Sequence, residues 1–263
     1  MTLAITPAQA RALAALRVGL PHTRLVLIGA SALGHHVSLD RATADLDLAI
    51  VLAPASLDEA VEPLGWTRDA RMRQRWFGPE GAIADLLPVT EELVAAGEVC
   101  FDEDDLRMSL VGFDLALRHT ARVPLPGSDV DVEVATLAAL VVLKIVAWLD
   151  RPHERAKDLG DLARILDAAL DDDDDRRWDA DDPIFQSGLA HDDQGAFFVG
   201  LEVARVAEHA HRACVDAFVA RVGDPDGEAF AAMLRAARYG GASPEERLAR
   251  RLDAFVRGFA RER

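Results

Sequence analysis

The sequence predicts an α/β fold, with a mixed β-sheet flanked by helices and followed by a helical C-terminal region. Two patterns indicate this fold class. Up to about residue 170, short apolar runs alternate with amphipathic helical stretches, and after residue 183 helical periodicity continues almost to the end. The chain has 263 residues, 50% of them hydrophobic, which is long enough to bury a core and too apolar for disorder.

The first predicted elements alternate between helix and strand. Residues 6–20 have amphipathic spacing, and Pro7 suits the first turn of a helix. The apolar run 24–29 ends in Gly and is typical of a buried strand. Three further elements follow in the same alternation: a helix over 31–39, a strand over 45–52 and a helix over 56–64. The last begins at a Ser with a Glu three residues later, the spacing of a capping box.

A β-hairpin is expected next. Residues 71–77 and 82–87 have strand composition and flank Gly78-Pro-Glu-Gly81, a turn sequence. Beyond the hairpin, the sequence predicts strands over 113–123 and 130–134 and helices over 136–149 and 157–170.

An acidic stretch indicates the domain organisation. Residues 167–182 hold nine Asp and two Arg, so their side chains should be solvated. We therefore expect a core domain over 1–170, an acidic linker over 171–182 and a helical domain over 183–263.

Charge and cysteine content exclude several classes of protein. The net charge of −16 disfavours passive binding of nucleic acid through released counterions. Cys100 and Cys214 lie in no CxxC or Cys/His cluster, so neither a structural zinc site nor a disulfide framework is expected.

No membrane association is expected either. The N-terminus has no pattern of a signal peptide, and the most apolar stretch, 134–149, is short and interrupted by Thr136 and Lys144. We therefore expect a cytoplasmic protein.

Three acidic residues on predicted strands suggest a metal site. Asp45 and Asp47 alternate with apolar residues, which puts both carboxylates on one face of a strand. Asp85 lies inside a second apolar strand, where a charge needs a partner such as a metal or an Arg. Carboxylate oxygens suit Mg²⁺. The alternative is an ordinary half-exposed strand with a polar face.

The order of these motifs resembles the nucleotidyltransferase superfamily of DNA polymerase β. Its signature is a strand that ends in Gly and a small residue before a helix, then an Asp-x-Asp strand, then a third Asp strand. Here these are 25–33, Asp45-Leu-Asp47 and Asp85. Where the family usually has Gly-Gly or Gly-Ser, this chain has Gly29-Ala30, with Ser31 following.

The downstream sequence resembles one branch, the AbiEii-type toxins of type IV toxin–antitoxin systems and their relatives. In that branch a helix that carries Lys precedes a Lys/Arg-Asp-x-x-Asp-Leu helix. Here the Lys is Lys144, and the second motif is Lys157-Asp-Leu-Gly-Asp-Leu162. The likeness covers roughly residues 20–170.

The resemblance implies transfer of NMP from an NTP to tRNA or protein, with two Mg²⁺ ions and release of pyrophosphate. It implies an antitoxin as a further partner. The residues that it assigns to metal binding and catalysis are Asp45, Asp47 and Asp85, with Lys144 also catalytic. Those assigned to the nucleotide are Gly29, Ser31, Arg41, Thr43 and Lys144. Supporting residues are Asp158 and Asp161.

Lys144 also draws attention without the resemblance. Helical spacing puts it on the apolar stripe of its helix, where an ammonium needs a partner or a ligand, unless it extends to the edge of the stripe. Asp158 and Asp161 lie one turn apart and could orient Lys144 or the acceptor, or could stabilise a helix N-terminus. Lys157 is expected to be solvated.

Two groups of arginines allow alternative interpretations. Arg71, Arg73 and Arg75 alternate and could form a positive strip on a strand, although a solvated edge is favoured. The arginines near the C-terminus could face an acceptor but are expected to be solvated. They are Arg247, Arg250, Arg251 and Arg257. Two other functions remain open, a non-catalytic binding module of the same fold and nucleotidylation of a small molecule such as an antibiotic.

Overall fold

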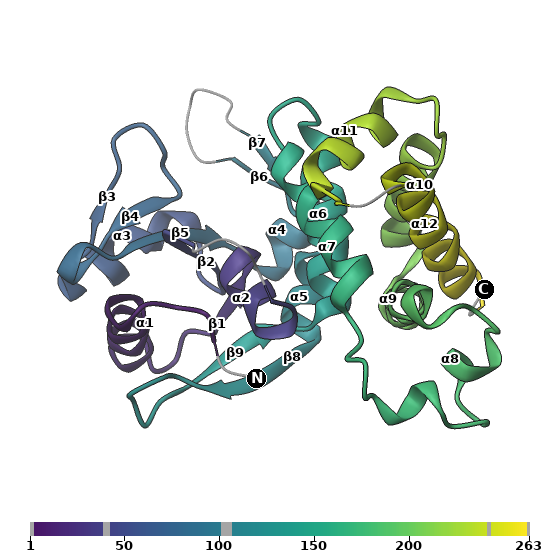
Figure 1. Ribbon diagram of the computed structural model, residues 1–263. Coiled ribbons are helices and arrows are strands. Elements are labelled where there is room, and N and C mark those ends of the chain that lie inside the picture. Colours follow the sequence, from purple (N-terminus) through teal and green to yellow (C-terminus); the bar gives the residue numbers. More distant parts are fainter. Residues whose placement is uncertain (1–2, 39–42, 101–106, 241–242, 262–263) are drawn as a thin grey trace. The chain divides into compact units, whose positions relative to one another are not determined.

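The computed structural model describes residues 3–38, 43–100, 107–240 and 243–261 (Figure 1). The predicted fold class is confirmed, because a mixed sheet flanked by helices precedes a helical C-terminal region. The chain divides into two compact units, Met1–Thr136 and Leu137–Arg263. This division lies before the two helices that the sequence assigned to the first domain, because both pack against helices of the second unit.

The first unit is built on a sheet of seven strands in its described part. In spatial order they are β3 (Thr67–Arg68), β4 (Arg75–Phe77), β5 (Ile83–Pro88), β2 (Asp45–Ile50), β1 (Leu25–Ile28), β9 (Asp131–Ala135) and β8 (Thr120–Pro124). The central strand β2 runs antiparallel to β1 and parallel to β5. Strand β1 is buried along its whole length, which explains its continuous apolar sequence.

Helices and a small second sheet complete this unit. The helices are α1 (Pro7–Gly19), α2 (Gly29–His36), α3 (Leu57–Val61), α4 (Glu91–Ala96) and α5 (Phe113–Arg118), and the small sheet pairs β6 (Glu98–Cys100) with β7 (Arg107–Ser109). Single 3₁₀ turns flank α3 and precede β5: η1 (Pro54–Ser56), η2 (Glu62–Leu64) and η3 (Pro79–Gly81). The predicted capping box at Ser56 is wrong, because η1 precedes α3 and the Ser56 side chain makes no capping hydrogen bond.

One predicted strand is partly helical in the structure. Residues 113–123 were expected to form one strand, but α5 occupies the first half and β8 the second. Asp114 and Arg118 form an i,i+4 ion pair that only a helix allows, and the buried Phe113, Leu115 and Ala116 anchor it.

The arginine strip at 71–75 does not form. Only Arg75 lies in β4, because the Asp69 carboxylate accepts hydrogen bonds from the backbone N–H groups of Arg71 and Met72 and closes a turn there. The predicted hairpin itself is confirmed, since β4 and β5 are antiparallel across η3.

The second unit is helical. Its helices are α6 (Leu137–Asp150), α7 (Ala156–Ala168), α8 (Pro183–Gln186), α9 (Gln194–Val206), α10 (His209–Val222), α11 (Glu228–Ala237) and α12 (Pro244–Ala260), with 3₁₀ turns η4 (Asp175–Arg177) and η5 (His191–Asp193). Helices α9 and α12 cross at two glycines. A Cβ on Gly200 would lie 2.1 Å from the Phe255 carbonyl oxygen, and one on Gly258 would lie 2.1 Å from that of Phe197. Only glycine permits so close an approach of the two backbones.

The acidic stretch is folded rather than a plain linker. Most of its carboxylates are exposed, as expected, but the Arg177 guanidinium inside it is buried. It donates hydrogen bonds to the carbonyl oxygens of Leu170, Asp171 and His191 and to Oε1 of Gln194. One buried cation therefore holds the backbone between α7 and α9.

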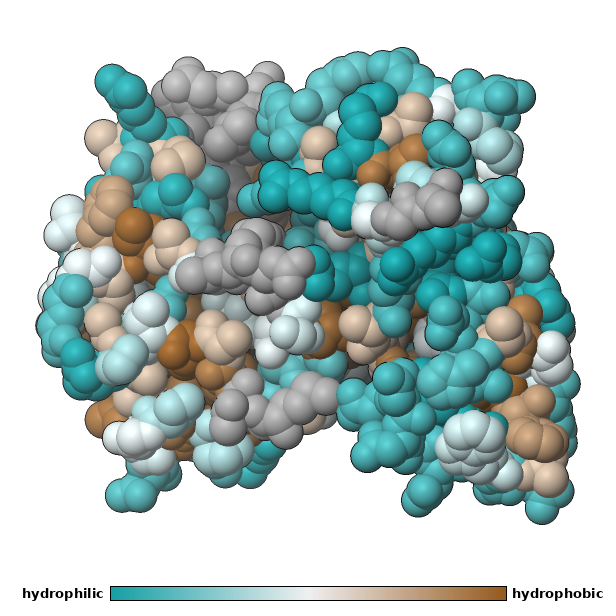
Figure 2. All heavy atoms as spheres, in the orientation of Figure 1, coloured by the Kyte–Doolittle hydropathy of each residue, from teal (hydrophilic) through white to brown (hydrophobic). Residues whose placement is uncertain are grey.

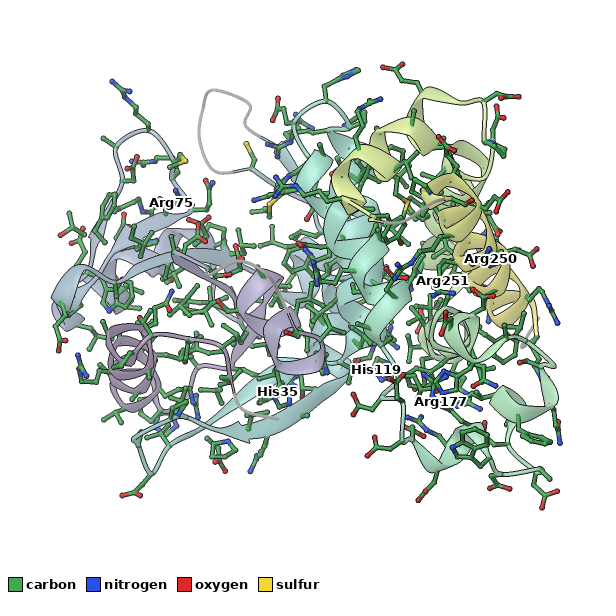
Figure 3. All side chains as sticks on the ribbon, in the orientation of Figure 1. His35, Arg75, His119, Arg177, Arg250 and Arg251 are labelled. Atoms are coloured by element: carbon green, nitrogen blue, oxygen red, sulfur yellow. The ribbon has the colours of Figure 1, made fainter. Side chains whose placement is uncertain are left out.

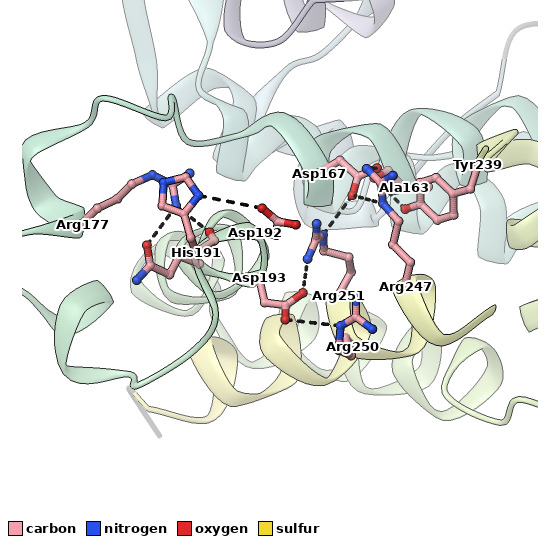
Figure 4. A network of polar contacts seen from close by, with 11 residues as sticks. Ala163, Asp167, Arg177, His191, Asp192, Asp193, Tyr239, Arg247, Arg250 and Arg251 are labelled. Atoms are coloured by element: carbon pink, nitrogen blue, oxygen red, sulfur yellow. Dashed lines mark hydrogen bonds and ion pairs between the residues drawn. The ribbon is translucent and has the colours of Figure 1, made fainter. Parts of the chain in front are cut away.

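The arginines of α12 were expected to be solvated, which is wrong for Arg251. Its side chain is 4% exposed and pairs with Asp167 of α7 and Asp193 of η5 (Figure 4). Arg247 and Arg250 contact the same two acids from more exposed positions. The network thus joins α12 to α7 and η5.

Tyr239 lies at the edge of this network (Figure 4), where its hydroxyl donates to the Ala163 carbonyl oxygen. Burial, reinforced by the charge of Asp167, raises the pKa of Tyr239. The fourth arginine of the group, Arg257, donates to the Ser187 carbonyl oxygen. All four arginines therefore contact other groups of the second unit.

The outward face of α12 is strongly hydrophilic (Figure 2), opposite an apolar stripe that is buried. In the described part of the chain, no helix combines the length and apolar character needed to cross a bilayer. Cys100 and Cys214 are both free thiols.

We expect Arg251→Ala to lower the free energy of unfolding by about 3–5 kcal/mol, because it leaves the buried Asp193 and the partly buried Asp167 without their shared partner. The matched variant Arg250→Ala removes a side chain that is 55% exposed and should cost less than about 1 kcal/mol. Urea denaturation of both variants measures the difference. Equal losses would contradict a central role for Arg251.

Candidate functional site

The three predicted metal ligands lie on one face of the central strands. Strands β2 and β5 pair in parallel with Asp47 opposite Asp85, and Asp45 lies two residues before Asp47 on β2. Their neighbours Leu46, Leu48, Ala84 and Leu86 are buried on the other face. Strand alternation in register therefore brings Asp45, Asp47 and Asp85 together, and we call them the carboxylate face.

Arg75 bridges two members of the carboxylate face. It lies on β4 (Figure 3), and the pairing of β4 with β5 puts it opposite Asp85. Its Nε donates to Asp85 Oδ1 at 2.8 Å, and its Nη2 donates to Asp85 Oδ2 at 2.9 Å and to Asp45 Oδ2 at 2.7 Å. The hydrogen bond to Asp85 is the main cause that raises the pKa of Arg75. Partial burial opposes it, and the charges of the acids add to it.

Sequence reasoning assigned Arg75 no role beyond membership of the arginine strip. A partial signal was present: counting outward from the Gly78–Gly81 turn pairs residue 75 with 84, the neighbour of Asp85, whereas in the structure residue 77 pairs with 83 and residue 75 with 85. An Arg opposite an acid that is expected to be buried is the pairing that burial of the acid requires. The hairpin prediction therefore brought Arg75 close to Asp85, and the register that makes them partners came from the structure.

Gly29 packs directly against Asp47. The residue has a φ of 66°, where strand β1 passes into helix α2. A Cβ at this position would lie 1.9 Å from Asp47 Oδ2, so the carboxylate rests on the bare α-carbon. Asp47 is thereby held beside the first turn of α2, where the positive end of the helix dipole favours an anion.

Ser31 supports the carboxylate face through the backbone. Its hydroxyl is buried and donates to the carbonyl oxygen of Asp45 at 3.2 Å. The sequence assigned this hydroxyl to a nucleotide, and in this structure it ties α2 to the start of β2. No side chain caps the N-terminus of α2.

Of the two residues assigned to the nucleotide in the segment before β2, Thr43 is described by the structure. The carbonyl oxygen of Thr43 accepts a hydrogen bond from Gln9, a buried residue of α1 whose side chain also caps that helix. The segment before β2 is therefore tied to α1. Arg41 lies outside the described residues.

Lys144 belongs to the second unit, where it forms a buried ion-pair cluster. Its Nζ lies 2.7 Å from Asp161 Oδ2 and 3.1 Å from Asp158 Oδ1, and all three residues are buried. Asp158 and Asp161 thus contact Lys144 directly, as their proposed role in orienting it requires. Burial disfavours the ammonium, but the charges and hydrogen bonds of both acids outweigh it, so the pKa of Lys144 is raised.

The donor set of the carboxylate face fits a hard divalent cation, because three carboxylates on paired strands offer only oxygen ligands. Yet no group of three or more His, Cys, Asp or Glu side chains in the described ranges is arranged to hold a metal ion. Two of the three acids turn toward Arg75 instead. A cation could use these ligands only after that ion pair opens.

We expect Gly29→Ala to displace Asp47 and to destabilise the first unit, because it adds a clash to a positive φ. Gly97→Ala is the matched control, since Gly97 has a φ of 77° but open space around its α-carbon. The backbone strain alone should cost about 1–2 kcal/mol in each variant. Thermal denaturation should show a clearly larger loss for Gly29→Ala, and equal losses would contradict the close packing.

Lys144→Met should lower the free energy of unfolding by about 3–5 kcal/mol, because two buried acids lose their counter-ion. Lys157→Met, at an exposed position of the next helix, should have little effect.

The pH dependence of this difference follows from the raised pKa of Lys144. The stabilisation should be complete below the unfolded-state lysine pKa of about 10.4 and should be lost only as pH rises through the higher folded value. Denaturation at pH 7 and pH 10 measures it. A stabilisation already reduced at pH 10 would show that the pKa is lowered instead.

Comparison with known proteins adds no assignment to this geometry. No protein-family model matches the chain. No curated protein matches it either. The interpretation of the site therefore rests on its own residues: three carboxylates on paired strands, an arginine that bridges two of them, a glycine-initiated helix beside the third, and a separate buried Lys–Asp–Asp cluster in the second unit.

Proposed function

We propose that this chain is a Mg²⁺-dependent nucleotidyltransferase that transfers NMP from an NTP to the hydroxyl of a macromolecule. The observation that carries the proposal is the carboxylate face, with Asp47 and Asp85 in register on paired strands beside the start of α2. Such an arrangement combines oxygen ligands for a hard cation with a helix N-terminus, which favours phosphate.

The carboxylate face has two tasks in the proposed reaction, metal binding and proton transfer. Bound Mg²⁺ would stabilise charge on the attacking and leaving oxygens of the phosphoryl group. Asp45 and Asp47 would hold the cation, and Asp85 would complete its ligands. Asp85 would accept the proton of the acceptor hydroxyl, whose oxygen then bonds to the α-phosphorus while the bridging bond to the β-phosphate breaks and pyrophosphate leaves.

The residues proposed for the triphosphate have less direct support. The backbone N–H groups at the start of α2 have no side-chain cap, which leaves them suited to an anion. Lys144 stays a prediction, because its ammonium would have to leave Asp158 and Asp161 to bind phosphate.

The acceptor and the wider context also stay predictions. A net charge of −16 favours a protein acceptor over extensive contact with RNA, although tRNA is the other acceptor that the family resemblance implies. An antitoxin partner and a cytoplasmic location belong to the same proposal.

One observation favours a second candidate, a non-catalytic binding module. The guanidinium of Arg75 already neutralises part of the carboxylate face, as a structural ion pair would. In that case the protein would bind an NTP or a partner without transfer.

The test is incubation of the purified chain with each α-labelled NTP, Mg²⁺ and either total tRNA or cell lysate. Label should enter one class of macromolecule. Asp47→Asn should reduce transfer by about a thousandfold, since metal stabilisation is worth several kcal/mol and each ~1.4 kcal/mol is tenfold.

Asp131→Asn is the matched control, because Asp131 is an exposed acid on the same sheet. It should leave transfer unchanged. Transfer that survives Asp47→Asn would sink the enzymatic assignment, and NTP binding without any transfer would favour the binding module.

A further inference from the structure

We propose that Arg75 is an internal competitor for the cation site: its guanidinium holds Asp45 and Asp85 while no divalent cation is bound, and it leaves them when one binds. This inference rests on the proposed function, since it concerns the same carboxylate face. It adds a residue that controls how tightly that face binds its cation.

The first argument is geometric. Arg75 engages Asp85 with two nitrogens and Asp45 with one of the same nitrogens, through three hydrogen bonds of 2.7–2.9 Å. Both Asp85 oxygens and one Asp45 oxygen are therefore used. A divalent cation needs the same oxygens and would lie beside the positive guanidinium, so guanidinium and cation compete for these acids.

The second argument is electrostatic. The carboxylate face places three acidic side chains on two adjacent strands, where like charges repel. Arg75 supplies one positive charge at this face from the third strand, β4. The metal-free fold is stabilised by that charge, and a divalent cation supplies twice as much.

The third argument is that Arg75 can leave. Its side chain is 23% exposed, so the guanidinium can move into solvent without disruption of the hydrophobic core. Strand β4 is short and follows the turn at Asp69, and the backbone pairing of β4 with β5 does not depend on the side chain. This distinguishes Arg75 from the buried Lys144 and Arg251.

The consequence is an affinity for divalent cations that is lower than the carboxylates alone would give. The free protein keeps a paired, stable site, and the cation has to break the pairing before it binds. Removal of the guanidinium should therefore tighten cation binding and weaken the metal-free fold at the same time.

The experiment measures binding of Mn²⁺, which accepts the same oxygen ligands as Mg²⁺, by titration calorimetry of the full chain. Arg75→Gln should lower the Kd for Mn²⁺ by about ten- to a hundredfold, the range expected when a charged hydrogen-bonded competitor is lost. Arg71→Gln removes the same charge from the preceding turn and should leave the Kd almost unchanged.

Thermal denaturation gives the second readout. In EDTA, Arg75→Gln should melt below the wild type, and saturating Mn²⁺ should raise its Tm by more than it raises that of the wild type. This pattern does not depend on any measurement of activity.

The outcomes separate the two proposals. Equal Mn²⁺ affinity in wild type and Arg75→Gln, or weaker binding by the variant, would overturn the competitor role and leave the cation site of the proposed function intact. Absence of Mn²⁺ binding in both proteins would overturn the cation site and the competitor role together.

Discussion

The stability of the first unit depends on compensation of the three carboxylates that share one face of its sheet. Strands β2 and β5 pair in register, so Asp47 and Asp85 cannot move apart without breaking the central ladder. Charges so close on adjacent strands need a compensating cation, and the guanidinium of Arg75 provides it for Asp85 and Asp45. The hairpin that carries Arg75 is therefore an electrostatic part of the site as well as an edge of the sheet.

In the second unit, cations that are more deeply buried also pair with two acids each. Lys144 lies between Asp158 and Asp161, and Arg251 lies between Asp167 and Asp193. In each case one buried cation joins two acids, which fixes helix α7 against α6 and against α12. The two units differ in the exposure of the cation, because Lys144 and Arg251 are buried whereas Arg75 is partly accessible to water. A buried ion pair stabilises the packing of its helices, whereas a partly exposed ion pair can exchange its cation for another.

Charge in this acidic chain is therefore arranged in two ways. Most carboxylates of the stretch 171–182 are exposed, and there the chain is held by one buried arginine that binds backbone carbonyl groups. The carboxylate face instead keeps its acids partly covered beside the start of a helix. Partial cover is the condition under which cation binding is strong, because water screens the charges less.

The α/β class, the hairpin and the common face of Asp45 and Asp47 could be predicted from the residues alone, because alternation along a strand is a local property. It could not determine that residues 113–118 are helical, since a short apolar run has no distinctive period. The packing of strands and helices decided that Asp85 lies in register with Asp47 and that Lys144 and Arg251 are each shared between two acids. It also decided that Arg75 reaches the carboxylate face. These pairings depend on which strands and helices become neighbours. The order of charged residues along the chain does not specify the distances between them in the folded protein.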